Sequence, residues 1–387
     1  MNAVKYLVGS KRMRAKSMRP FSDEICDFLA ALSRELTKNA KRFPDIGAFA
    51  FYCRKANIER LKSSFNDLSN RLGRGVCFHI TPSNIPVNFA FSWLFSLLAG
   101  NANIVRVPSK NFEQIDLICK AIKEILKDYI EIEKRNAFVS YASDLETTKT
   151  FSLLSDARMI WGGDETVLAI KAIDAKPRCI DVAFADRYSI AIIDSEAIEK
   201  MDETAITKLA ENFYNDTYLM DQNACSSPRL ILWLNANETA KNRFWNSVFS
   251  YAQKRYGIQT ALAVNKYVKL CEDSIDLDLY KATRIGSLLY IIRLRSLPDN
   301  LDKLRESGGY FYEYDLESLD DLGAIVTERF QTLTYFGIEA ELLRRFIVDN
   351  ALCGIDRIAP IGKAMDIGAI WDGYDLIRTL SRIVHIG

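Results

Sequence analysis

Residues 77–110 constrain the fold of this chain more than any other stretch of the sequence. They read CFHITPSNIPVNFAFSWLFSLLAGNANIVRVPSK, in which two short apolar runs are each followed by a polar loop and a helical segment. The pattern is therefore strand, polar loop, buried helix, turn, strand, polar loop and helix. Alternation of this kind predicts an α/β fold, in which parallel strands form a sheet and helices pack on its faces.

The two polar loops of this stretch carry side chains suited to binding. Open α/β sheets bind ligands at the carboxyl ends of their strands, where both loops are expected. Asn84 in the first loop can donate its amide to an oxyanion, or can form an Asx-turn that caps the next helix. Arg106 and Lys110 flank the second loop and indicate an anion site; the alternative is a charged surface turn with Ser109 as an N-cap.

A glycine pair, Gly162 and Gly163, lies between an expected strand over 158–161 and an expected helix over 166–173. Glycines at a helix start allow a phosphate or a cofactor to approach the backbone closely, although many such pairs are only turns. The G-x-G-x-x-G pattern of common dinucleotide-binding sites is absent from the sequence. The pair is therefore a candidate cofactor contact of a less common type.

Cys225 differs from the other seven cysteines in its surroundings, because a polar loop precedes it and Ser-Ser-Pro follows it. A nucleophilic cysteine acts through its thiolate, which needs exposure and nearby donors. The alternative is a packing residue, the usual role of an intracellular cysteine. The eight cysteines are scattered without a C-x-x-C pair, so we expect reduced thiols in a cytoplasmic protein.

The composition narrows the classes of protein and partner. The 387 residues are 49% hydrophobic and carry a formal net charge of +1, which is enough chain for two domains and gives no indication of nucleic-acid binding. With only two histidines, we expect no histidine-rich metal site. The N-terminus lacks the apolar core of a signal peptide, and the longest apolar stretch, 87–99, is shorter than the roughly 20 residues that span a bilayer. We therefore expect a cytoplasmic protein without a membrane span.

Periodicity along the chain predicts the remaining organisation. Helices are expected over 48–72 and near 374–384, and a strand over 189–193 precedes a charged segment. The predicted domains are N-terminal helices with a nucleotide-binding domain, a domain that carries Cys225, and a C-terminal segment that returns to the first domain. Their bounds are 1–194, 195–358 and 359–387.

Five blocks in order resemble the acyl-CoA reductase family typified by the bioluminescence fatty-acid reductase, within the aldehyde dehydrogenase superfamily. The blocks are HITPSNIPVNF, GNANIVRVPSK, WGGDETV, DQNACSSPR and WDGYDL, and the resemblance covers roughly residues 70–385. It implies an aldehyde dehydrogenase-like α/β fold with a Rossmann-type cofactor domain and an α/β catalytic domain.

The resemblance also implies roles for individual residues. Cys225 would be the nucleophile, and Asn84 with the Cys225 backbone N–H would form an oxyanion hole. Ser109 and Lys110, flanked by Arg106, would bind the adenosine side of the cofactor. The glycine pair would lie near the pyrophosphate or the nicotinamide ribose. Because NAD-preferring members often have glutamate where Lys110 stands, NADPH is the expected cofactor and NADH the alternative.

One departure from the superfamily bears on the reaction. Aldehyde-oxidising members have a glutamate that activates water, and a gapless comparison places Ala183 there. Loss of that base would protect an acyl-enzyme from hydrolysis and suit thioester chemistry. No residue is assigned as the general acid; Asp186 and Glu165 lie near the relevant blocks but are equally expected to be structural.

The resulting hypothesis is reduction of an acyl-CoA or acyl-protein thioester, fatty acyl by family resemblance, to an aldehyde through an acyl-cysteine. The implied partners are the thioester, an acyl-protein synthetase and, in a homo-oligomer, further copies of the chain. Two alternatives stay open: an aldehyde dehydrogenase acting oxidatively, and a non-catalytic nucleotide-binding partner of an acyl-transfer enzyme.

Overall fold

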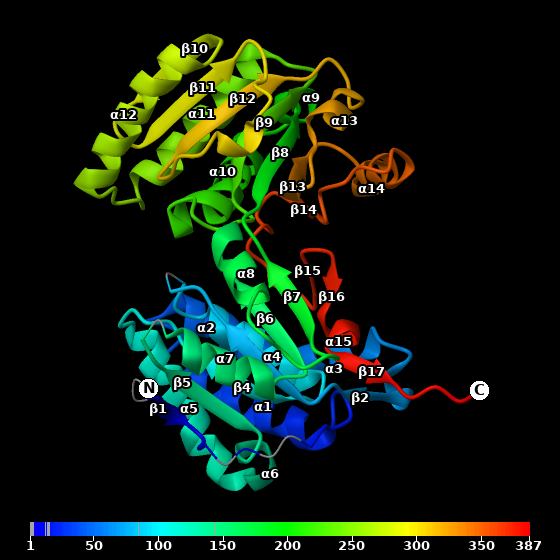
Figure 1. Ribbon diagram of the computed structural model, residues 1–387. Helices are drawn as coiled ribbons and strands as arrows, with labels where there is room; N and C mark the ends of the chain where they lie inside the picture. The colour runs from blue at the N-terminus through cyan, green and yellow to red at the C-terminus, as the bar shows by residue number, and fades with distance from the viewer. Residues whose placement is uncertain (1–3, 12, 14–15, 84, 143) are drawn as a thin grey trace. The chain divides into compact units, whose positions relative to one another are not determined.

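The computed structural model describes residues 4–11, 13, 16–83, 85–142 and 144–387. The chain forms two compact units, Met1–Ala185 with Ala369–Gly387, and Asp186–Gly368 (Figure 1). The boundaries expected from the sequence were 194 and 358. The strand that follows residue 185 belongs to the second unit because its hydrogen-bonded neighbours are strands of that unit.

The first unit contains a six-stranded sheet with the order β1-β5-β4-β3-β6-β7. All neighbouring strands are parallel except β1, which is antiparallel to β5. The strands are β1 (Lys5–Val8), β3 (Val76–Ile80), β4 (Ala102–Arg106), β5 (Asn136–Ser140), β6 (Ala157–Trp161) and β7 (Ile180–Phe184). Because β3 is parallel to its neighbours β4 and β6, the loops after these three strands leave from the same edge of the sheet.

Helix α4 (Asn88–Leu98) confirms the buried helix expected after the first polar loop, since ten of its eleven side chains are buried. Hydrogen bonds from Ser92 and Trp93 of α4 link the helix to the sheet. Ser92 pairs with His79 at 2.8 Å, and Trp93 Nε1 donates to Asn136 Oδ1 at 2.7 Å. Burial lowers the pKa of His79 to about 4, so the ring is neutral at pH 7. Among the described residues, no helix has both the length and the apolar character needed to cross a membrane.

Two helix predictions in the first unit are wrong. The segment 48–72 is not one helix, because Arg54 adopts an extended conformation between α2 and α3 and the last residues form strand β2. The segment 374–384 contains only a four-residue helix, and its end pairs with β2 as strand β17. The further elements of this unit are α1 (Asp23–Thr37), α2 (Pro44–Tyr52), α3 (Lys55–Ser63), β2 (Arg71–Gly73), α5 (Glu113–Ile125), α6 (Ile130–Glu133), α7 (Leu145–Leu154), α8 (Asp164–Lys171), β15 (Ile370–Trp371), β16 (Tyr374–Asp375), α15 (Leu376–Thr379) and β17 (Ser381–Ile383), with 3₁₀ turns η1 (Leu68–Asn70) and η2 (Leu126–Asp128).

The second unit contains a seven-stranded sheet with the order β10-β11-β12-β9-β8-β13-β14, parallel except for β10 (Figure 1). Alternate side chains of β8 enter two different apolar cores, Ile190 and Ile192 one core, Ala191 and Ile193 the other. A strand buried on both faces is typical of parallel sheets covered by helices. The strands are β8 (Tyr188–Asp194), β9 (Pro228–Leu234), β10 (Leu279–Ile285), β11 (Leu289–Leu294), β12 (Tyr310–Asp315), β13 (Phe330–Phe336) and β14 (Arg357–Pro360). The helices are α9 (Ser195–Glu199), α10 (Glu203–Thr217), α11 (Glu238–Gln253), α12 (Thr260–Asp276), α13 (Asp321–Ile325) and α14 (Ala340–Asp349), with 3₁₀ turns η3 (Tyr218–Met220) and η4 (Leu301–Lys303).

The turn between α4 and β4 provides a test of this fold. Gly100 has a φ of +89°, and a Cβ there would lie 2.2 Å from the carbonyl oxygen of Met18. We expect Gly100→Ala to lower the free energy of unfolding by at least about 1–3 kcal/mol, because the strained backbone and the clash add. Urea unfolding should show a lower midpoint for this variant than for Gly257→Ala, whose new Cβ would meet nothing within 4 Å. Equal midpoints would contradict the described turn.

Candidate active site

The loop that carries Cys225 runs from the end of η3 to the start of β9, and its backbone is held in an uncommon conformation. Asp221 and Gln222 both have positive φ values, 49° and 63°. Conformations of this kind persist only where the surroundings over-determine them. The buried Gln222 side chain provides that constraint: its Oε1 accepts from the N–H groups of Gly309 and Tyr310, and its Nε2 donates to the carbonyls of Pro228 and Tyr310. The loop is therefore braced against the sheet.

Cys225 is exposed at the amino ends of the parallel strands of the second unit. Its carbonyl oxygen accepts a 2.6 Å hydrogen bond from Ser189 Oγ, and the same Oγ accepts from the backbone N–H of Thr332. Ser189 and Thr332 lie near the starts of β8 and β13. Exposure alone does not single Cys225 out, because Cys271 and Cys353 are exposed as well. The braced loop is what distinguishes it.

Asp216 connects the Cys225 loop to a second loop, residues 361–366. It is 1% exposed, and its carboxylate accepts the backbone N–H groups of Gly362 at 2.6 Å and Ala364 at 2.9 Å. Its own carbonyl accepts the hydroxyl of Ser227 at 2.7 Å. Burial raises the pKa of Asp216 to about 6, although the two N–H donors oppose this shift.

Arg357 also binds the loop of residues 361–366. Its guanidinium donates to the carbonyls of Ala364 at 2.6 Å and of Lys363 and Asp366 at 2.7 Å. Burial lowers the pKa of Arg357, and the charges of Asp366, Asp216 and Cys225 oppose that shift. The Arg357 cation and a Cys225 thiolate would therefore stabilise each other.

Ser189, Asp216, Gln222 and Arg357 were not predicted as parts of this site. Only Gln222 lies within a motif that the sequence reveals, the block DQNACSSPR. Asp216 lies nine residues before Cys225 but outside that block, while Ser189 and Arg357 are single polar residues far from Cys225 in the chain. No local pattern separates these three from ordinary surface residues.

The expected cofactor residues Arg106, Ser109 and Lys110 lie together in the first unit, at and after the carboxyl end of β4. Ser109 and Lys110 are exposed, while the guanidinium of Arg106 lies over the ring of Tyr141 at 4.5 Å. The interpretation of Ser109 as an N-cap is wrong, because α5 begins at Glu113. Thr81 Oγ1 donates to the Arg106 carbonyl, so the loops after β3 and β4 are in contact.

The glycine pair follows β6 and begins α8. A Cβ at Gly163 would meet nothing within 4 Å, whereas one at Gly162 would lie 2.9 Å from Thr166 of the same helix. The space beside Gly163 thus admits another molecule. Asp164 and Glu165 occupy the first turn of α8, and their carboxylates favour hydroxyl donors over phosphates at this position.

The structure describes some of the remaining candidate residues but not all of them. Asn84 lies outside the described residues. Ala183 is half-buried within β7. Asp186 is paired with Arg305 at 2.7 Å, which gives its carboxylate a structural partner. Among the residues that the structure describes, no group of three or more His, Cys, Asp or Glu side chains could hold a metal ion.

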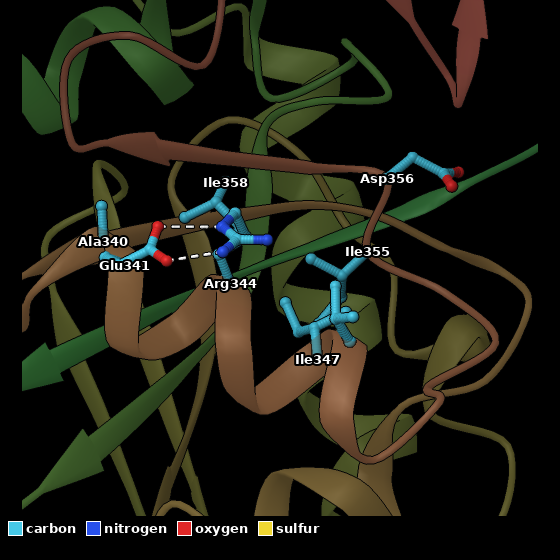
Figure 2. A pocket seen from close by; sticks show the side chains of 8 residues that line it. Ala340, Glu341, Arg344, Ile347, Ile355, Asp356 and Ile358 are labelled. Carbon is cyan, nitrogen blue, oxygen red and sulfur yellow. Dashed lines mark hydrogen bonds and ion pairs between the residues drawn. The ribbon is translucent and has the colours of Figure 1, made fainter.

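A separate cavity of about 560 Å³ lies between α14 and the segment 355–358 (Figure 2). None of the candidate site residues lines it. Its rim carries the exposed ion pair of Glu341 and Arg344, at 2.5 Å. The residues that line the cavity are Ala340, Glu341, Arg344, Ile347, Val348, Ile355, Asp356 and Ile358.

The fold is that of the aldehyde dehydrogenases. Aldehyde dehydrogenase 21 from Physcomitrella patens, solved in complex with the reaction product succinate, matches with a TM-score of 0.65 at 10% identity over 93% of this chain and 85% of that one. A variant of 1-pyrroline-5-carboxylate dehydrogenase from Thermus thermophilus matches with a TM-score of 0.60 at 12% identity, over 93% and 78%. A variant of Proline Utilization A from Bradyrhizobium japonicum matches with a TM-score of 0.62 at 16% identity, over 91% and 40%. The chain thus spans about two fifths of the Proline Utilization A proteins that it matches.

A sequence profile of the acyl-CoA reductase (LuxC) family matches residues 54–259, more than half of the chain. The chain belongs to this family, which confirms the resemblance and assigns it to a class of oxidoreductases. The matched range includes Ser109, Lys110 and Cys225 but ends well before Arg357. A search of curated proteins found no match to the chain.

The buried carboxylate of Asp216 predicts a pH dependence of stability. Because the folded-state pKa of about 6 lies above the usual 3.8, the native state holds this proton more tightly, and the contribution of Asp216 falls as pH rises from 4 to 6. Between pH 4.5 and 7, the wild-type chain should lose about 2 kcal/mol of unfolding free energy relative to Asp216→Asn. Urea unfolding of both proteins at the two pH values measures this. A difference that does not change with pH would contradict it.

Proposed function

We propose that this protein reduces the thioester of a fatty acyl-CoA or a fatty acyl-protein to an aldehyde, through an acyl group on Cys225. The observation that carries the proposal is the exposed Cys225 on a braced loop beside the cation of Arg357, in a chain of the acyl-CoA reductase family. Exposure and a neighbouring cation are the two conditions that favour a reactive thiolate.

In the proposed reaction, the thiolate of Cys225 attacks the thioester carbonyl and a carbon–sulfur bond forms. Asn84 and the Cys225 backbone N–H would donate to the oxyanion of the tetrahedral intermediate. The oxyanion collapses, the substrate carbon–sulfur bond breaks, and the departing thiolate takes a proton from solvent. A nicotinamide cofactor held by Ser109, Lys110 and the space at Gly163 would supply the hydride for reduction of the acyl group. The Cys225 thiolate is then the leaving group, and the product is a free aldehyde.

Two features support reduction over oxidation of an aldehyde to an acid. Ala183 has no group that can activate water, so the acyl-cysteine would persist until it is reduced. The two nearest acidic residues in the sequence, Asp181 and Asp186, form ion pairs with Arg158 and Arg305. Neither residue supplies a base for hydrolysis.

The described residues of the first unit fit a nicotinamide cofactor. Lys110 and Ser109 at the end of β4 would hold the adenosine side, with Arg106 as a further cation. The open space at Gly163 would accept a ribose, whose hydroxyls can donate to the carboxylates that begin α8. A lysine attracts the 2′-phosphate of NADPH, and this supports NADPH over NADH.

We further propose a cytoplasmic location, because a nucleophilic thiolate requires a reducing compartment. An acyl-protein synthetase as the donor and association into a homo-oligomer are proposals that rest on the family alone.

The nucleophile is tested by Cys225→Ala, with Cys271→Ala as a matched control for loss of an exposed thiol. We expect Cys225→Ala to lose acyl-dependent NADPH oxidation by at least about 10³-fold, because no acyl-enzyme can form. NADPH oxidation over a panel of acyl-CoA substrates, with direct detection of aldehyde, measures the activity. NADPH binding by fluorescence titration should be retained in both variants. Normal turnover in Cys225→Ala would overturn the assignment.

The cofactor is tested by Lys110→Glu, with Lys120→Glu as a control that makes the same charge change on an exposed face of α5. A carboxylate at 110 would repel a 2′-phosphate and accept from a ribose 2′-hydroxyl. The ratio of kcat/KM for NADPH to that for NADH should fall about tenfold or more in Lys110→Glu only. An unchanged ratio would remove Lys110 from the cofactor site.

A further inference from the structure

Arg357 lies at the same end of the second sheet as Cys225. It is the first residue of edge strand β14 and pairs in register with Thr332 of β13. The N–H of Thr332 donates to Ser189 Oγ, which in turn donates to the Cys225 carbonyl. Three neighbouring strands and their hydrogen bonds therefore fix the distance between Arg357 and the Cys225 backbone.

The guanidinium is oriented by fixed backbone acceptors. It donates hydrogen bonds to the carbonyls of residues 363, 364 and 366. Met365, which lies between them in the chain, contacts the Ser226 hydroxyl through its sulfur at 3.7 Å. Asp216 holds the N–H groups of the same loop. The cation thus occupies one position beside the loop that contains Cys225.

The other charges near this position are largely paired. Asp366 forms an ion pair with Lys363 at 3.1 Å. Asp216 is bonded to two backbone N–H groups. On the opposite side of the Cys225 loop, Asp221 accepts from Tyr256, and Arg229 donates to the carbonyls of Gln222 and Glu306. Arg357 lies beside this loop, and a negative charge on Cys225 raises the pKa of its guanidinium against the effect of burial.

We infer that Arg357 is a positioning residue for the thioester reaction: its fixed positive charge keeps Cys225 in the thiolate form near neutral pH. The inference rests on the proposed role of Cys225 as nucleophile. A guanidinium is suited to this task because it stays protonated at every physiological pH.

The same charge acts twice in the reaction cycle. Before acylation it increases the fraction of thiolate that can attack the thioester carbonyl. After reduction of the acyl group, Cys225 must leave as a thiolate, and the cation stabilises that leaving group. Arg357 should therefore affect both halves of the reaction through Cys225 without contacting the substrate.

The test is the pH profile of Cys225 alkylation by iodoacetamide in the full chain, followed by mass spectrometry of the peptide that contains it. In Arg357→Met the midpoint should rise by about one pH unit, and the rate at pH 7 should fall about tenfold. Arg357→Lys, which retains a cation, should restore most of the rate. Arg344→Met makes the same charge change at an exposed ion pair on α14 and should leave the profile unmoved. A profile that Arg357→Met does not move would overturn the inference.

The wild-type protein supplies a second measurement in case Arg357→Met does not fold. Cys225 should alkylate with a midpoint at lower pH than Cys271, which is exposed on α12. A midpoint equal to or above that of Cys271 would overturn the inference. Because alkylation requires neither thioester nor cofactor, a protein that shows the shifted profile but produces no aldehyde would contradict only the proposed function.

Discussion

The carboxylate of Asp216 is the interaction on which the candidate site depends. Asp216 lies at the end of α10. Its carboxylate accepts hydrogen bonds from the N–H groups of Gly362 and Ala364, and its backbone carbonyl accepts one from the Ser227 hydroxyl. One buried side chain thus joins a helix, the Cys225 loop and a loop more than a hundred residues away. Burying a carboxylate is unfavourable unless donors compensate, and the two N–H groups offset part of that penalty. The same loop fixes the position of Arg357, because the guanidinium donates hydrogen bonds to its backbone carbonyls.

The two units use opposite ends of their parallel strands. In the first unit the cofactor candidates lie at the carboxyl ends of β4 and β6, as is common for open α/β sheets. In the second unit Cys225 lies at the amino ends of β8, β9 and β13. Under the proposed function, the cation of Arg357 would make that end suitable for an anionic thiolate. Cofactor binding and nucleophile activation would then use opposite ends of the strands in the two units.

The sequence predicted the elements whose local pattern is strong. The apolar segment that became α4 contains no charged residue, so burial on all sides was the only arrangement available to it. The two helix predictions failed because tertiary strand pairing overrides local helix propensity in those segments. Arg54 breaks the helix expected over 48–72, and Leu72 pairs with β17 from the other end of the chain. Such long-range pairing leaves no periodic signal in either segment.

The sequence by itself indicated the family, the α/β class and the candidate residues that lie in motifs: Ser109, Lys110, the glycine pair and Cys225. Each could be found because its neighbours in the chain carry the signal. The tertiary structure alone decided what surrounds Cys225. Ser189, Asp216 and Arg357 reach it through strand pairing and burial, and these depend on which segments meet in the folded sheet. A charge acts through space, so its effect on a thiol cannot be read from its place in the chain.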